Sequence, residues 1–283
     1  MFRRQKTGSV LCTSCGKLVG VRDPVCWNCG RRNPGLWGFG PILRGLGRDL
    51  GFTSIVITAC IILYAASLAL DPRGVASGGL FNLFSPSMRS LFMLGASGAA
   101  PVFGFGRWWT VLSASWLHGS LLHILFNMLW VRQLAPDVVE LYGAPRAVII
   151  YTAAGIGGFT LSSCAGLLLG GMPIPFLRGA QLTIGASASI FGLLGALVYY
   201  GRRGGSRHIS GQATSMAVVL FIFGFIMPNI DNYAHLGGFL GGYGMAKWLD
   251  PLEPERTDHM IWALVCLAAT AASILASFLV RPF

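Results

Sequence analysis

Seven long apolar segments constrain what this 283-residue chain can fold into. The segments are Thr53 to Leu70, Leu112 to Leu134, Ala147 to Gly170, Thr183 to Tyr200, Ala213 to Met227, Ala234 to Leu249 and Met260 to Val280. About 20 apolar residues are needed for a helix to cross a bilayer, and every backbone polar group in lipid must be satisfied within the protein. The chain is 54% hydrophobic and 11% charged, which excludes an ordinary soluble domain. The sequence therefore predicts an all-α polytopic membrane protein.

Two of the segments differ from the rest. The fifth, 213–227, and the sixth, 234–249, are short and contain glycine. Helices of this kind suit contact with other helices better than contact with lipid. We therefore expect the fifth and sixth helices to be buried within the protein.

The basic residues predict the orientation of the chain. Of its 21 Lys and Arg residues, sixteen lie in the tail up to Asp49 and in alternate loops, and five lie in the remaining loops. By the positive-inside rule the N-terminus is cytoplasmic and, after seven spans, the C-terminus is outside. The net charge of +11 is then an orientation signal, so nucleic acid is not an expected partner. We expect a multi-pass protein of the cell membrane, in contact with the lipid bilayer.

Four cysteines in the N-terminal tail form two CxxC pairs. They are Cys12, Cys15, Cys26 and Cys29. Four thiolates in two such turns suit a structural zinc site, and Gly16 and Gly30 permit the tight turns. Two disulfides or a redox pair are the alternatives, which a reducing cytoplasm disfavours. We predict a zinc-ribbon-like module over 1–33, followed by a linker over 34–52. Its role is structural or is to bind a cytoplasmic protein partner.

Four polar residues lie inside the apolar segments. His123 and Asn127, in HILFNMLW, are four residues apart and so share a helical face. Ser187 lies in GASASIFG and His235 in DNYAHLGGFLGG. Each alone is commonly a packing residue or an interhelical hydrogen bond. In the predicted orientation, however, His123, Ser187 and His235 all fall in the outer half of their segments, and packing alone gives no reason for that shared depth.

These stretches, in this order and on the second, fourth and sixth spans, resemble the rhomboid family of intramembrane serine proteases. The resemblance covers about Arg48 to Phe283. It implies a six-helix core, here 53–259, with a seventh helix and tail over 260–283. It also implies hydrolysis of single-span membrane proteins near the outer face by a Ser/His dyad, with no cofactor for catalysis.

Residue by residue, the resemblance implies that Ser187 attacks the scissile carbonyl while His235 accepts its proton. It assigns His123, Asn127 and the backbone N–H of Ser187 to the oxyanion. Hydroxyl nucleophiles need an adjacent base, and each preorganised donor is worth about a hundred- to a thousandfold in rate. The chemistry is therefore consistent with the implied roles.

Further residues are implied to support the dyad. Phe191 matches the aromatic position that stacks on the histidine, and Gly185 lies at the helix N-terminus, whose dipole favours negative charge. Gly238 and Gly242 share a face with His235 and would let the sixth helix approach the fourth. One departure concerns the loop before the second span, where Thr110 stands in place of the family's usual arginine. That departure leaves open how the loop is anchored, with Arg107 as a replacement.

Three hypotheses of different classes follow. An active intramembrane protease requires both Ser187 and His235, which are present. A catalytically inactive rhomboid-like protein that holds client transmembrane segments would be expected to have lost one of them. A seven-helix transporter or receptor with a zinc module would carry ionisable pairs along its spans, whereas these spans contain almost none. The first hypothesis is favoured.

Overall fold

The computed structural model describes residues 4–45, 47, 49–174, 177–227 and 230–280. The outermost residues of the expected module and of the expected tail, 1–3 and 281–283, lie outside this range, as does Arg48 at the start of the resemblance. Residues 46, 175–176 and 228–229 lie outside it as well.

The described residues contain two short strands, ten α-helices and a few single turns. The strands are β1 (Ser9–Leu11) and β2 (Leu18–Gly20), and the helices are α1 (Gly40–Arg44), α2 (Phe52–Leu70), α3 (Met88–Leu94), α4 (Thr110–Ser113), α5 (Leu121–Tyr142), α6 (Ala144–Leu169), α7 (Ser187–Arg203), α8 (Arg207–Ile226), α9 (Asn232–Trp248) and α10 (Thr257–Leu279). The single turns are η1 (Leu36–Gly38), η2 (Pro72–Gly74), η3 (Leu80–Asn82), η4 (Ala100–Gly104) and η5 (Ala114–Trp116).

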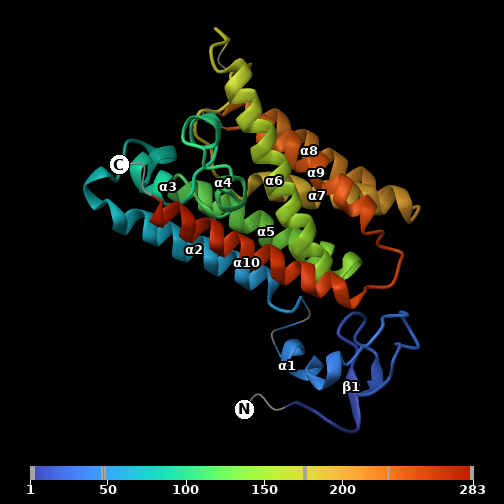
Figure 1. The fold of residues 1–283 in the computed structure, drawn as a ribbon. Coiled ribbons are helices and arrows are strands. Elements are labelled where there is room, and N and C mark those ends of the chain that lie inside the picture. The colour runs from blue at the N-terminus through green and yellow to red at the C-terminus, as the bar shows by residue number, and fades with distance from the viewer. Residues whose placement is uncertain (1–3, 46, 48, 175–176, 228–229, 281–283) are drawn as a thin grey trace.

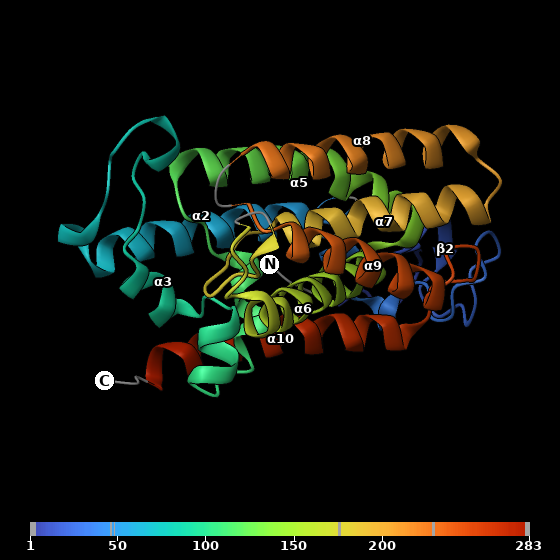
Figure 2. The ribbon, with the colours of Figure 1, turned by 90° about the horizontal axis from the view of Figure 1, so that it is seen from above.

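Seven of the described helices are 17 residues or longer, namely α2 and α5 to α10. They pack together in one bundle (Figures 1 and 2). Within the described residues, four of them, α2, α6, α8 and α10, are long and apolar enough to cross a membrane. Helix α9 packs against both α6 and α7, and α5, α6 and α7 supply most of the buried core. The protein is a mostly helical, polytopic membrane protein, as the composition indicates.

The expectation that the fifth helix is buried is wrong. Only 17% of the apolar stretch of α8 is buried, compared with 61% for α6. Val219 and Ile226 of α8 are 64% and 70% exposed. The physical reason is that α8 presents large apolar side chains that are suited to lipid, whereas α9 presents glycines that permit close helix packing. The expected segment 213–227 was short only because α8 begins earlier, at Arg207, so its shortness was no sign of burial.

Several helix starts also differ from the expected segments, and two of them bear on the expected site. Helix α5 begins at Leu121 rather than Leu112, because the Ser120 hydroxyl caps it by accepting from the His123 N–H at 3.3 Å. Helix α7 begins at Ser187 rather than Thr183, because Gly185 has φ +129°, which is incompatible with a helix. Both shifts place a polar residue of the expected site in the first turn of its helix.

The bundle has two distinct ends. We call the end that contains Leu121, Ser187 and Asn232 the distal end, and the end that contains Tyr142 and Trp248 the proximal end. Residues 4–33, called the module below, lie beside the proximal end, next to the chain that enters α10 (Figure 1). All the polar residues of the expected site therefore lie at the end opposite the module.

The long loop before α5 is anchored by Arg107. Its side chain is buried and donates to the Phe92 carbonyl at 2.8 Å and to the Ser277 carbonyl of α10 at 2.6 Å. The guanidinium carbon also lies 4.3 Å from the centre of the Phe92 ring. Thr110, in the position where arginine was expected, bonds the Arg107 carbonyl instead at 2.8 Å. Arg107, three residues before Thr110, thus ties this loop to α10.

Candidate functional site

A serine and a histidine meet at the distal end. The Oγ atom of Ser187, on the first residue of α7, lies 2.9 Å from Nε2 of His235, on the fourth residue of α9. The two residues are 48 positions apart in sequence. His235 is 6% exposed, while Ser187 is half-buried, so part of its side chain is accessible at the protein surface. This distance is a normal hydrogen bond, so the imidazole is placed to accept the hydroxyl proton.

The backbone before Ser187 is fixed by the loop that precedes α5. Thr183 pairs with Ser97 in an isolated antiparallel bridge, with N···O distances of 2.7 and 3.0 Å. The Gly185 N–H then donates to the Ala114 carbonyl at 2.9 Å. These bonds bring the chain into α7 at a defined angle. Ser187 therefore stands at the helix N-terminus, where the free N–H groups and the dipole favour a negative charge.

His235 is held by an aromatic stack. The ring of Phe191, one turn after Ser187 on α7, lies parallel to the imidazole, with centroids 4.2 Å apart and planes at 17°. Phe221 of α8 contacts the edge of the Phe191 ring. Within the described residues, Nδ1 of His235 has no hydrogen-bond partner. Stacking, rather than a carboxylate, orients this imidazole.

The start of α9 depends on an aspartate that the sequence analysis did not single out. The Asp231 side chain caps α9 by accepting from the Ala234 N–H at 3.0 Å, and it also accepts from the Ser162 hydroxyl of α6. Ser162 is fully buried. An aspartate just before a helix is a recognisable capping signal, so the cap could have been found from the sequence. Its bond to Ser162 could not.

Glycines bring α9 against α7. A Cβ atom added at Gly238 would lie 2.1 Å from the Ala188 carbonyl oxygen, and one added at Gly242 would lie 2.3 Å from the Gly192 Cα. No side chain fits at either point, because such contacts are far inside van der Waals distance. The close approach of the two backbones is what allows the side chains of Ser187 and His235 to meet.

His123 lies beside the dyad, and Asn127 is one turn further along α5. The Gly119 N–H donates to Nδ1 of His123 at 3.2 Å, so the proton of a neutral imidazole is carried by Nε2. A Cβ added at Gly185 would lie 2.7 Å from this Nε2 atom. Asn127 donates one amide hydrogen to the His123 carbonyl at 2.9 Å, and its second amide hydrogen is left for another acceptor. Both residues can donate hydrogen bonds at the site.

Two neighbouring polar residues do not join this group. Ser189 points to the other side of α7, where its hydroxyl donates to the Tyr151 carbonyl at 2.8 Å. His118 is fully buried with its ring 5.2 Å from that of His123, and neither of its nitrogens has a partner within the described residues. Neither side chain is bonded to Ser187 or His235 in the described part of the chain.

The four cysteines of the module converge on one point. Their sulfur atoms all lie within 4.8 Å of one another, with 3.8 Å between Cys12 and Cys29 and 3.6 Å between Cys15 and Cys26. A disulfide requires about 2.05 Å, whereas a tetrahedral ion with sulfur bonds of about 2.3 Å separates its ligands by about 3.8 Å. The residues fit a four-thiolate metal site.

The two turns around these thiols have the same backbone geometry. Gly16 and Gly30 have φ +74° and +71°, and each donates its N–H to the carbonyl of the first cysteine of its turn, at 2.9 and 3.0 Å. Burial raises the pKa values of Cys12 and Cys29. Burial acts in the same direction on Cys15, but hydrogen bonds from the Lys17 backbone and from neighbouring thiols outweigh it and lower the pKa of Cys15 to about 7. A bound cation would hold all four sulfurs as thiolates.

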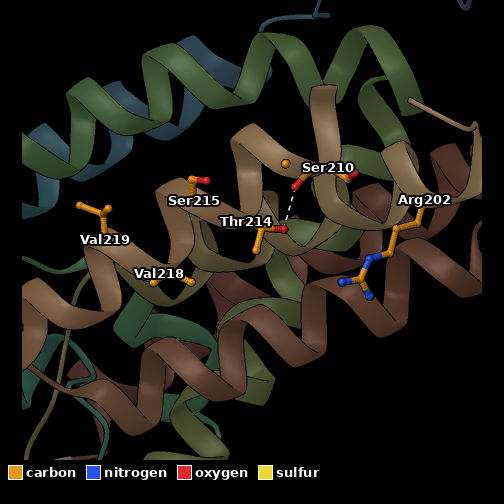
Figure 3. A pocket seen from close by; sticks show the side chains of 7 residues that line it. Arg202, Ser210, Thr214, Ser215, Val218 and Val219 are labelled. Atoms are coloured by element: carbon orange, nitrogen blue, oxygen red, sulfur yellow. Dashed lines mark hydrogen bonds between the residues drawn. The ribbon is translucent and has the colours of Figure 1, made fainter. Parts of the chain in front are cut away.

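A groove of about 540 Å³ lies elsewhere, on the outer surface of α8 (Figure 3). Arg202 of α7 and residues of α8 line it, among them Ser210 and Thr214, whose hydroxyl donates to the Ser210 carbonyl at 2.7 Å. None of the residues expected at the site takes part. The groove lies near the start of α8 at the proximal end, so it is separate from Ser187 and His235.

Comparison with known proteins fits this geometry. The sequence model of the family described as a rhomboid domain matches residues 105–250, more than half of the chain. The protein belongs to the rhomboid family. The matched range contains α5 to α9 and excludes the module, α2 and α10.

Individual rhomboid relatives come from several kingdoms. The chain is 33% identical to rhomboid protease GluP of Bacillus subtilis over 60% of this chain and 32% of that protein. It is 32% identical to RHOMBOID-like protein 5 of Arabidopsis thaliana over 70% of this chain and 67% of that protein. It is 26% identical to rhomboid-like protease 3 of Toxoplasma gondii over 85% of this chain and 84% of that protein. The match therefore spans about a third of the Bacillus protein and most of the Toxoplasma protein.

Proposed function

We propose that this rhomboid is an intramembrane serine endopeptidase that cuts single-span membrane proteins with the dyad Ser187 and His235. The observation that carries the proposal is the 2.9 Å contact between Ser187 Oγ and His235 Nε2. The similarity to proteins named as rhomboid proteases supports the same reaction class. This reaction needs a hydroxyl nucleophile and an adjacent base, and the contact supports these roles for Ser187 and His235.

The residues present suggest one sequence of steps. Ser187 Oγ attacks the scissile carbonyl as His235 Nε2 takes its proton, and the oxyanion is stabilised by His123, Asn127 and backbone N–H groups at the start of α7. The imidazolium then gives the proton to the leaving amine, and water hydrolyses the acyl-enzyme by the same route in reverse. No metal or cofactor is assigned to any step.

Cleavage and active-site labelling test this proposal. Purified protein in liposomes is given a single-span membrane substrate and, separately, a serine-directed fluorophosphonate. We expect wild type to cut and to label, and Ser187→Ala and His235→Ala to do neither. Ser189→Ala is the matched control, because that hydroxyl bonds Tyr151 instead. A folded wild type that neither cuts nor labels would identify an inactive rhomboid that holds client helices.

The proposed orientation has the proximal end in the cytoplasm and the distal site near the outer face of the cell membrane. Sixteen of the 21 Lys and Arg residues belong to the N-terminal tail or to the proximal halves of the helices and the loops that join them, which supports this orientation. Reporter fusions at the two termini test it. A C-terminal fusion should be active only when the reporter is one that works outside the cytoplasm. Activity of a cytoplasmic reporter at the C-terminus would overturn the orientation.

We also propose that the metal of the four-cysteine site is structural zinc. The four thiol ligands and their separations support a closed tetrahedral site with no open position for catalysis. The metal would be held by Cys12, Cys15, Cys26 and Cys29 and would supply folding energy for a module with a very small core. Metal analysis of purified protein should give one zinc per chain. A cytoplasmic protein partner for the module remains part of the same proposal.

A further inference from the structure

A buried ion pair joins the module to the membrane bundle. The Arg31 guanidinium donates to the Glu255 carboxylate, and both side chains are 1% exposed. Arg31 follows the second CxxC turn by two residues, while Glu255 lies 224 residues later, between α9 and α10. Burying two charges requires that they stay paired, because separating them leaves each charge without solvent or partner. This contact therefore belongs to a close-fitting interface.

Both CxxC turns contribute to this interface. Ser14, between the two cysteines of the first turn, lies close to the Glu255 carboxylate. Burial raises the pKa of that carboxyl, and the charges of Arg31 and Arg146 and the Ser14 hydroxyl oppose the rise. In the second turn, a Cβ added at Gly30 would lie 3.0 Å from Pro254. The Glu255 carboxylate can therefore contact both turns only while the turns keep this position relative to each other.

A metal ion would hold the turns in that relation. The carbonyl of Arg31 accepts from the Cys26 N–H at 2.8 Å, so the position of Arg31 follows the fold of its CxxC turn. The sulfur atoms of the two turns meet, at 3.8 Å between Cys12 and Cys29 and 3.6 Å between Cys15 and Cys26, and the buried core around them is otherwise three valines, Val10, Val19 and Val21. Since the module has so small a core, its turns keep their relative position only while the metal is bound.

The other side of the interface is the loop 249–256, which follows α9. Arg146 of α6 donates from one nitrogen to the carbonyls of Leu249, Asp250 and Glu253, at 3.2, 2.9 and 3.0 Å. The membrane core thus holds the first half of the loop 249–256, and the module holds the second half through Glu255. The same helix α9 carries His235 near its distal end.

We propose that the four-cysteine module is a metal-dependent clamp on the loop 249–256, and that it regulates the site by fixing the proximal end of α9. The regulatory part rests on the proposed proteolytic function. With metal bound, Arg31 and Ser14 receive Glu255 and the loop is closed. Without metal, the turns separate, Glu255 loses its Arg31 partner and, of these contacts, those from Arg146 alone still hold the loop that follows α9.

Hydrogen–deuterium exchange on the full chain in liposomes tests the clamp without reference to activity. Peptides covering 249–256 contain the reporter N–H of Glu253, which bonds the Asp250 carbonyl at 3.1 Å. We expect removal of Zn²⁺ by a chelator to raise exchange there about tenfold, while peptides of α8 stay unchanged. Equal exchange before and after a measured loss of zinc overturns the clamp.

Point variants separate the ion pair from the metal. Arg31→Ala and Glu255→Gln should open the loop while one zinc stays bound. The matched controls are Arg32→Ala and Glu253→Gln, which remove the same charges from exposed neighbours. The clamp is also overturned if Arg31→Ala exchanges like Arg32→Ala.

Fluorophosphonate labelling of Ser187 in the same samples tests regulation. We expect the labelling rate to fall about fivefold in Arg31→Ala and after chelation, but not in Arg32→Ala. An open loop with an unchanged labelling rate overturns the regulatory part. If wild type does not label at all, the proposed protease function fails, and the exchange results still decide whether the clamp exists.

Discussion

Gly238 of α9 lies directly against the backbone of Ala188 of α7, so close that an added Cβ would be 2.1 Å from the Ala188 carbonyl oxygen. This carbonyl belongs to the residue that follows Ser187, so moving it away from Gly238 would also shift the first turn of α7. Gly238 therefore sets the distance between the two helices that carry the dyad.

Gly238→Ala should force α9 away from α7. We expect a loss of about 1–3 kcal/mol in the free energy of unfolding, and a drop in fluorophosphonate labelling of more than about tenfold as His235 leaves hydrogen-bond range. Gly244→Ala on the same helix is the control, because nothing lies within 4 Å of its Cβ position. Thermal unfolding in detergent measures the first effect. Normal labelling by Gly238→Ala would show that the helix spacing is not set here.

Phe191→Leu should disorder the imidazole of His235. Loss of a stack at 4.2 Å removes about 0.5–1.5 kcal/mol of orientation energy, so the labelling rate should fall by roughly three- to tenfold. The control is Phe239→Leu, which breaks a stack with Tyr243 elsewhere on α9. If both variants label equally fast, stacking on Phe191 does not position the histidine.

Asp231→Ala should loosen the first turn of α9. Removing a helix cap costs about 1 kcal/mol, and here the bond to Ser162 is lost as well. We expect a lower melting temperature together with slower labelling. Asp231→Asn should recover most of the loss, since asparagine caps equally well. Failure of asparagine to rescue would mean that the charge, rather than the cap, is what matters.

His123→Ala and Asn127→Ala should each slow the chemical step. Loss of one oxyanion donor costs about a hundred- to a thousandfold in kcat, while KM should stay nearly constant because these donors act on the developing charge. Initial rates over a range of substrate densities in liposomes separate the two constants. A rise in KM at constant kcat would assign these residues to substrate binding.

Arg107→Ala should release the long loop before α5. The variant leaves the Ser277 carbonyl without its arginine donor, which costs about 1–3 kcal/mol for a buried group left unpaired. It also removes one of two donors to the Phe92 carbonyl, which still accepts from the Gly95 N–H at 3.2 Å. We expect faster proteolytic nicking between residues 71 and 106. Arg89→Ala, an exposed arginine of the same loop, is the control. Equal nicking rates in the two variants would contradict the anchor.

Much of the fold was predictable because the membrane restricts the choices. A 20-residue apolar segment in lipid has to be a helix, so the positions of α2, α6 and α10 follow from composition alone. Helix starts were less predictable. The start of α7 depends on the positive φ of Gly185 and on pairing of Thr183 with Ser97, and these contacts bridge segments far apart in the chain. The exposure of α8 likewise depends on its neighbours.

The sequence by itself determined that the chain spans a membrane and that four thiols are spaced for one metal ion, and it predicted a common depth for Ser187 and His235. These properties depend on local composition and spacing, which act on each segment separately. Only the tertiary structure decided that Ser187 and His235 are 2.9 Å apart, that Asp231 bonds Ser162, and that Arg31 of the module pairs with Glu255 beyond α9. Each of these contacts joins residues 48 or more positions apart, and its geometry is set by how closely whole helices pack.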